Sequence, residues 1–143
     1  MTIKDKAIQF RNLSKNINKV ATDWLVSNSD IIIDELRLQW DSGDAELGKM
    51  PTYATPSYAL AKQKKGSKSG MHYDLNLQGD FRDAMYAKPV SKGIQISSKD
   101  SKLSSINKLT KGDNIWKLNK EHKKTFVELA LPDFQKRFKN ELK

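Results

Sequence analysis

Residues 40–86 read WDSGDAELGKMPTYATPSYALAKQKKGSKSGMHYDLNLQGDFRDAMY, and this stretch decides how the rest of the chain is organised. It is rich in Gly, Pro, Asp and Ser, the residues that turn a chain. It also carries regularly spaced tyrosines and leucines, which ordinary linkers lack. An irregular backbone with apolar anchors is typical of a structured, functional connection.

A helical pattern precedes this stretch. Apolar residues recur every three to four positions from Ile17 to Trp40, which predicts one helix over about residues 15–39 with a buried stripe. The sequence Ser27-Asn28-Ser29-Asp30 interrupts the apolar run. Such residues cap helices, so we expect the helix to bend or restart there. Residues 1–15 are expected to form either a short helix or an arm that a partner orders.

A β-hairpin is predicted after the stretch, with arms at Phe81–Val90 and Gly93–Ser98, because apolar and polar residues alternate in both arms. Asp100 is expected to cap a short helix that Gly112 closes. Ile115, Trp116 and Leu118 form a short apolar segment after it.

Two helices are predicted at the C-terminal end. The first runs from Asn119 to about Ala130, and the second starts at Pro132, because proline suits a first helical turn and breaks a helix interior. Phe134, Phe138 and Leu142 then form one apolar ridge, which packs either on the chain's own core or on a partner.

The predicted fold is α+β: a long N-terminal helix packed on a small antiparallel sheet with a β-hairpin, followed by C-terminal helices. Residues 1–143 form a single domain, because the chain is long enough for one core and too short for two. The residues expected to meet in this core are Trp24, Leu36, Leu77, Phe81, Ile94, Ile96 and Leu109.

The composition excludes several kinds of site. The chain has no cysteine, so it has neither disulfides nor thiolate metal ligands. It has no apolar run of about 18 residues and no apolar segment typical of a signal peptide near its start, so we expect a soluble, cytoplasmic protein without a membrane partner.

The net charge of +9 is unevenly distributed. Residues 23–46 carry seven acids and one base, whereas residues 51–143 carry nineteen bases and nine acids. This split favours either nucleic-acid binding by the basic part or head-to-tail packing of acidic on basic surfaces between copies. A lysine-rich solvated surface is the third alternative.

Residues 62–72 are predicted to form a flexible basic loop, because lysines alternate there with Gly and Ser. Such a run is usually just solvated. The functional alternative is contact with DNA phosphates, for which lysines need no particular sequence. The candidate residues for this contact are Lys62, Lys64, Lys65 and Lys68.

No catalytic, cofactor-binding or metal-ligating site is predicted. His72 and His122 have no second His or Cys at ligand spacing and are expected to be solvated. Asp41, Asp44 and Glu46 are acids of the type that holds Mg²⁺, but they lie in a turn without the strand acid and lysine of a nuclease. The sequence lacks the glycine-rich motif that binds nucleotide phosphates. We therefore expect a protein that is not an enzyme.

The order of these features resembles the tail-completion and neck proteins of tailed bacteriophages. The resemblance covers roughly residues 17–118 and rests on Gly48-Lys49, the spaced Tyr53, Tyr58 and Lys62, and the run Leu75-x-Leu77-x-Gly79-x-Phe81 that enters the hairpin. In that family a long N-terminal helix leads into such a loop, and the turn opens an antiparallel sheet.

The resemblance implies a structural virion protein that forms an oligomeric ring, 6- or 12-fold, at the head–tail junction between the portal side and the tail. Its partners are then copies of itself, the portal, other neck or tail proteins and, non-specifically, packaged DNA. The protein would occupy the virion, and the host cytoplasm during assembly. The candidate subunit-interface residues are Tyr53, Tyr58, Asp41, Asp44 and Glu46. The alternative is a small, basic, nucleic-acid-binding protein of the cytoplasm.

Overall fold

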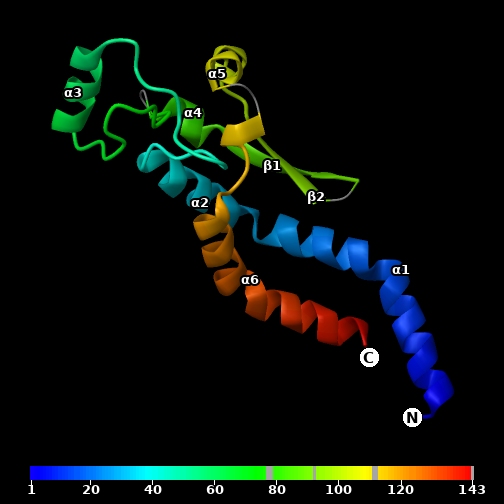
Figure 1. The fold of residues 1–143 in the computed structure, drawn as a ribbon. Helices are drawn as coiled ribbons and strands as arrows, with labels where there is room; N and C mark the ends of the chain where they lie inside the picture. The colour runs from blue at the N-terminus through cyan, green and yellow to red at the C-terminus, as the bar shows by residue number, and fades with distance from the viewer. Residues whose placement is uncertain (77–78, 92, 111–112, 143) are drawn as a thin grey trace.

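Figure 1 shows the fold in a computed structural model, which describes residues 1–76, 79–91, 93–110 and 113–142. The elements in chain order are α1 (Ile3–Ser27), α2 (Ser29–Asp41), α3 (Pro56–Lys64), α4 (Asp80–Asp83), β1 (Met85–Val90), β2 (Gly93–Ser98), α5 (Leu103–Thr110), the 3₁₀ helix η1 (Asp113–Ile115) and α6 (Lys120–Glu141). The fold is α+β, as the sequence predicts: a long N-terminal helix, an antiparallel hairpin and C-terminal helices.

The N-terminal helix starts earlier than predicted and ends where the sequence places its weak point. Thr2 caps α1 through a reciprocal pair of hydrogen bonds with Asp5, so residues 3–15 continue the helix and do not form a separate arm. The break falls at Asn28, whose side-chain amide donates to the carbonyl of Trp24 at 2.8 Å and to the carboxylate of Asp133 at 2.8 Å. Asn28 therefore ties the joint between α1 and α2 to α6.

The sheet consists of β1 and β2 paired antiparallel, with Met85 opposite Ser98 and Val90 opposite Gly93. The first arm is shorter than the predicted Phe81–Val90, because residues 80–83 form the helical turn α4. Gly79 precedes this turn with φ of 85°, a left-handed conformation that glycine adopts without strain.

The core lies between α2, the hairpin, α6 and the loop residues around them. Leu36 and Trp40 of α2 are completely buried, and the Trp40 indole N–H donates to the carbonyl of Ile115 at 3.0 Å. Ile115 is itself completely buried. The segment around Ile115, which leads into α6, is therefore anchored on α2.

The predicted core is largely confirmed. Leu36, Phe81 and Ile96 are buried, and Trp24 and Ile94 pack against the core while half-buried. The assignment of Leu109 is wrong, because this side chain is 57% exposed on α5. Leu77 lies outside the described residues.

The prediction that a fresh helix starts at Pro132 is wrong, because α6 runs continuously from Lys120 to Glu141 with Pro132 inside it. Contacts with the first helix hold α6 on both sides of the proline. The Trp24 indole donates to the carbonyl of Ala130 at 2.8 Å, and Asp133 accepts from Asn28. Figure 1 shows that the α6 ribbon changes direction along its length, as expected for a helix containing a proline.

The C-terminal ridge packs on the chain itself. The ring centroids of Trp24 and Phe134 lie 5.0 Å apart, and those of Phe134 and Phe138 lie 6.2 Å apart. Of the two alternatives for this ridge, the structure shows Phe134 packed on Trp24 of the chain's own first helix and Phe138 stacked on Phe134.

No helix in the described ranges is both long enough and apolar enough to cross a membrane.

Candidate functional site

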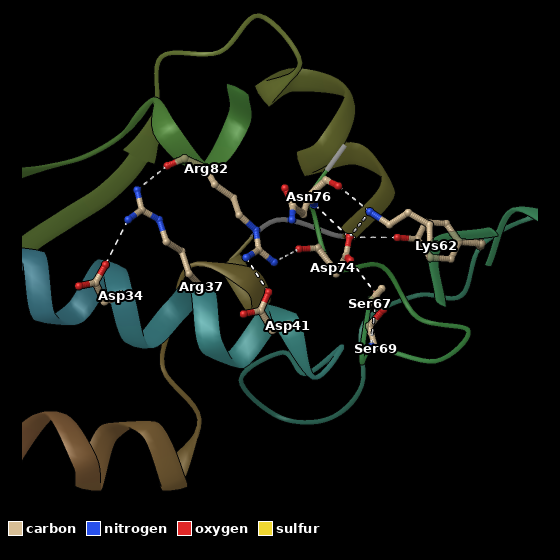
Figure 2. Close-up of polar contacts among 10 residues, drawn as sticks. Asp34, Arg37, Asp41, Lys62, Ser67, Ser69, Asp74, Asn76 and Arg82 are labelled. Carbon is tan, nitrogen blue, oxygen red and sulfur yellow. Dashed lines mark hydrogen bonds and ion pairs between the residues drawn. The ribbon is translucent and has the colours of Figure 1, made fainter. Parts of the chain in front are cut away.

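The irregular stretch of residues 41–76 is organised around one buried carboxylate, that of Asp74, a residue that is 4% exposed (Figure 2). One carboxylate oxygen accepts from the Tyr53 hydroxyl at 3.1 Å and the Asn76 N–H at 3.0 Å, and pairs with the Lys62 ammonium at 2.9 Å. The other accepts from the Ser67 hydroxyl at 2.9 Å. Asp74 therefore joins α3, the basic loop and the segment leading to α4.

The electrostatics of Asp74 follow from these contacts. Burial by itself raises the pKa of the Asp74 carboxyl, but the Asn76 N–H, the Lys62 ammonium and the Ser67 hydroxyl outweigh it. The net pKa of Asp74 lies below its ordinary value. Burial and the negative charge of Asp74 raise the pKa of the Tyr53 hydroxyl well above its usual range. Asp74 therefore stays ionised and Tyr53 stays protonated at neutral pH.

Two arginines connect this network to α2. Arg82 donates to the Asp41 carboxylate at 2.7 Å and to the backbone carbonyl of Asp74. Arg37 donates to Asp34 at 3.1 Å and to the backbone carbonyl of Arg82 at 2.8 Å. In Figure 2 the two guanidinium groups lie between the helical turns of α2 and the α4 segment. The long-range pairing of Arg82 with Asp41 had no local signal in the sequence.

The prediction that Lys62 is solvated is wrong. Its side chain is 13% exposed, and its ammonium also donates to the Asn76 carbonyl at 2.5 Å. A buried carboxylate is costly without a cation beside it, and Lys62 at the end of α3 supplies the cation for Asp74. Lys64, Lys65 and Lys68 are exposed, as predicted.

The basic loop is packed at its base and is not a free chain. Ser69 is 3% exposed and donates to the carbonyl of His72 at 2.8 Å. The His72 ring lies with Nδ1 2.5 Å from the carbonyl oxygen of Met50. Gly43 packs against this base so closely that a Cβ added to it would lie 2.8 Å from Cβ of His72 and 3.0 Å from the Ser69 carbonyl oxygen. Residues 62–72 are therefore only partly the flexible loop that the sequence predicts.

Both histidines differ from the prediction of solvated surface residues. His72 is half-buried by the contact just described. His122 on α6 lies with Nδ1 2.6 Å from the Glu35 carboxylate on α2, with side-chain exposures of 16% and 8%. The burial of Glu35 explains the pairing, because a buried carboxylate needs a hydrogen-bond donor. The buried Gln39, one helical turn further along α2, bridges to the carbonyl of Lys117 and the N–H of Asn119.

The predicted subunit-interface residues differ in exposure. Tyr53 is buried, with its ring 5.0 Å from that of Tyr58 and 4.7 Å from that of Tyr73, which leaves little of its side chain for contact with another subunit. Its hydroxyl is taken by Asp74, which is why it points inward. Tyr58 is 42% exposed. The remaining acids are paired or half-buried: Asp41 with Arg82, Asp44 with Lys49 at 2.6 Å, and Glu46 half-buried.

A cleft of about 600 Å³ opens beside the network, between α2 and the basic loop. Its wall carries Asp41 and Tyr58 together with Lys65 and Lys68, so both signs of charge face it. The described residues contain no group of three or more His, Cys, Asp or Glu side chains that could hold a metal ion. Both carboxylate oxygens of Asp74 are engaged, so this carboxylate is arranged to hold segments together and not to exchange protons with a ligand.

Comparison of this chain with protein-family models, with curated proteins and with solved structures finds no match.

Proposed function

We propose that this chain is a structural, non-enzymatic protein of a tailed phage, which forms an oligomeric ring at the head–tail junction between the portal side and the tail. The observation that carries the proposal is the large accessible surface of the isolated chain. It exposes 9503 Å², whereas a compact monomer of 16.3 kDa exposes about 7,500 Å². The excess is about 2,000 Å².

This excess is of the size that two subunit contacts would cover. A protomer in a ring has two neighbours, and a standard interface takes about 800 Å² from each partner, or about 1,600 Å² for two. A chain of this size with that much extra surface offers area for contacts with other chains, and the ring proposal assigns these contacts to copies of itself.

Exposed apolar side chains support the same assignment. At the start of α1, Ile3 is 89% exposed, Ile8 45% and Phe10 63%. Figure 1 shows this half of α1 extending away from the hairpin, past the end of α6. On α6, Leu129 is 59% exposed. Large exposed apolar side chains grouped on projecting elements are typical of interaction surfaces.

Pairing within the chain reduces the charge that residues 23–46 offer to the acidic-on-basic contact that the charge split favours. Most acids of residues 23–46 have partners within the chain: Asp34 pairs with Arg37, Asp41 with Arg82, Asp44 with Lys49 and Glu35 with His122. We therefore assign the association to apolar side chains of the projecting helix, with charge in a secondary role.

The mass of the purified protein tests the ring. Sedimentation and native mass spectrometry, with negative-stain images, should show a closed oligomer, alone or with a portal ring as template. Phe10→Ser should shift the distribution toward monomer, whereas the neighbouring exposed Asn12→Ser should not. A monomer at all concentrations, with and without a portal ring, would contradict the ring.

The junction role has its own test. Phage particles assembled without this protein should accumulate as DNA-filled or leaking heads and separate tails. Particles that still join heads to tails and keep their DNA would rule out the junction role.

The second candidate is nucleic-acid binding, favoured by the exposed Lys64, Lys65 and Lys68, of which Lys65 and Lys68 line the cleft. Binding to duplex DNA should then weaken steeply with salt. Replacing the three lysines with Gln should make the slope of log K against log salt concentration less steep. The change should be about 0.9 for each phosphate that the loop no longer neutralises. An unchanged slope excludes this loop from DNA contact.

A further inference from the structure

The outer edge of β2 has backbone groups with no partner in the described part of the chain. Hydrogen-bonded and non-hydrogen-bonded pairs alternate along an antiparallel ladder. The N–H of Lys99 donates to the carbonyl of Ala84 at 3.0 Å, which makes this pair a hydrogen-bonded one. In steps of two along the register, the next such pairs are Tyr86 with Ser97, Lys88 with Gln95, and Val90 with Gly93. The N–H and C=O groups of Ile94 and Ile96 therefore point away from β1.

Among the residues that the structure describes, no hydrogen bond reaches the backbone of Ile94 or Ile96 from the outer side. The corresponding outward positions of β1 include Pro89, which has no N–H to offer. Proline on an edge strand is a common means of preventing further pairing. The hairpin therefore has one edge that proline blunts, β1, and one that remains available, β2.

A groove of about 360 Å³ runs along the available edge. Residues 94–97 form one wall. Successive residues of a strand belong to opposite faces of the sheet, so a wall of four consecutive residues places the groove at the sheet edge. Asn107, Trp116 and Lys117 form the opposite wall. A groove between these two walls suits a single extended segment, the form in which a peptide adds to a sheet edge.

The charge of the groove selects among such segments. Lys117 is exposed and lines the groove, and none of its described lining residues is acidic. Lys88 and Lys99 add exposed positive charge on and beside the hairpin. A segment with acidic side chains complements this surface.

We propose that the outer edge of β2 binds an extended acidic segment of another polypeptide, which adds to the hairpin as a third strand. The backbone of Ile94 and Ile96 supplies the main-chain hydrogen bonds, the space beside Trp116 takes an apolar side chain, and Lys117 pairs with an acid. Strand addition of this kind takes its affinity from main-chain bonds and its specificity from alternate side chains. The inference is independent of the ring, because it rests on the backbone of one chain.

The probe is a displayed library of random peptides of about eight residues, panned against the full chain. The enriched peptides should be acidic with alternating apolar residues. Ile94→Pro should bind them at least about tenfold more weakly than Ile94→Val, because proline removes the outward N–H and no bond of the β1–β2 ladder. Lys117→Glu should weaken binding of the acidic peptides as well.

Two measurements on the unmodified protein keep the proposal testable if Ile94→Pro fails to fold. N-methylation of alternate peptide amides should abolish binding in one register and leave it intact in the other. The amides of Ile94 and Ile96 should exchange hydrogen faster than those of Gln95 and Ser97 in the free protein, and should become protected when peptide binds. The proposal would be overturned if no peptide were enriched, if peptides bound equally to Ile94→Pro and Ile94→Val, or if methylation in the two registers had equal effects.

Discussion

Replacing Lys62 with methionine is expected to destabilise the protein by about 3 kcal/mol. The side chain of Lys62 is 13% exposed and that of Asp74 is 6% exposed, so their pair is largely removed from water. Removing one partner of a buried ion pair typically costs about 3–5 kcal/mol, because the other charge stays buried. Asp74 keeps its bonds to Tyr53, Ser67 and Asn76, which places the expected loss at the lower end.

The matched control is Lys64→Met, two residues further along α3 and exposed. Removing an exposed lysine changes stability by about 0–1 kcal/mol. The assay is urea unfolding monitored by circular dichroism. The slope of the unfolding free energy against urea concentration must be the same for the unmodified protein, Lys62→Met and Lys64→Met. If Lys62→Met and Lys64→Met have the same midpoint, the Asp74 network does not stabilise the fold as argued.

The pH dependence gives the same prediction a second readout. The pKa of Asp74 is lowered in the folded state, so its contribution to stability is fully present above the unfolded pKa of about 3.9. That contribution is lost as the pH falls through the lower folded pKa. Lys62→Met removes the ammonium group, which is one of the groups that lower the pKa of Asp74. The difference in the free energy of unfolding between the unmodified protein and Lys62→Met should therefore have its full value at neutral pH and become smaller below about pH 4.

Three further substitutions follow from single contacts. Trp24→Ala should cost about 3–5 kcal/mol, because it removes a half-buried indole that donates to the Ala130 carbonyl and packs on two phenylalanines; an unchanged unfolding midpoint would refute this. His122→Ala should cost about 1–3 kcal/mol, since it leaves the buried Glu35 side chain without its hydrogen-bond partner, and an unchanged unfolding midpoint would contradict this contact. Gly43→Ala should destabilise by about 2 kcal/mol, because φ is 71° and the added methyl meets backbone and side-chain atoms; Gly48→Ala, with no atom within 4 Å, should be neutral or slightly stabilising.

The sequence predicts the local elements well because their causes are local. The alternation in residues 93–98 gives β2, and the Ser-Asn-Ser-Asp run places the helix break at Asn28. The apolar stripe correctly assigns Leu36 to the core. Each of these signals lies within a few residues of the structure that it specifies.

The polar network could not be predicted because its partners are far apart in the sequence. Arg82 reaches Asp41 across 41 positions, and His122 reaches Glu35 across 87. A lysine in a run of lysines, such as Lys62, has the same local signature whether it is solvated or paired with a buried acid. The continuity of α6 could not be predicted for the same reason, because contacts with distant residues hold the helix together across Pro132.

The contacts of the Asp74 network fix the conformation of the irregular stretch. They also determine which of its side chains a partner can reach. Tyr53 is unavailable, because its ring is packed between two tyrosines and its hydroxyl is bonded to Asp74. The turn at residues 44–49 is held by the bond from the Ala45 N–H to the Gly48 carbonyl at 2.7 Å, and it presents Leu47 at 84% exposure. An apolar side chain on a fixed turn loses little conformational freedom when it is covered. On this argument a partner that binds residues 41–62 meets Leu47 and the half-exposed Tyr58, and not Tyr53.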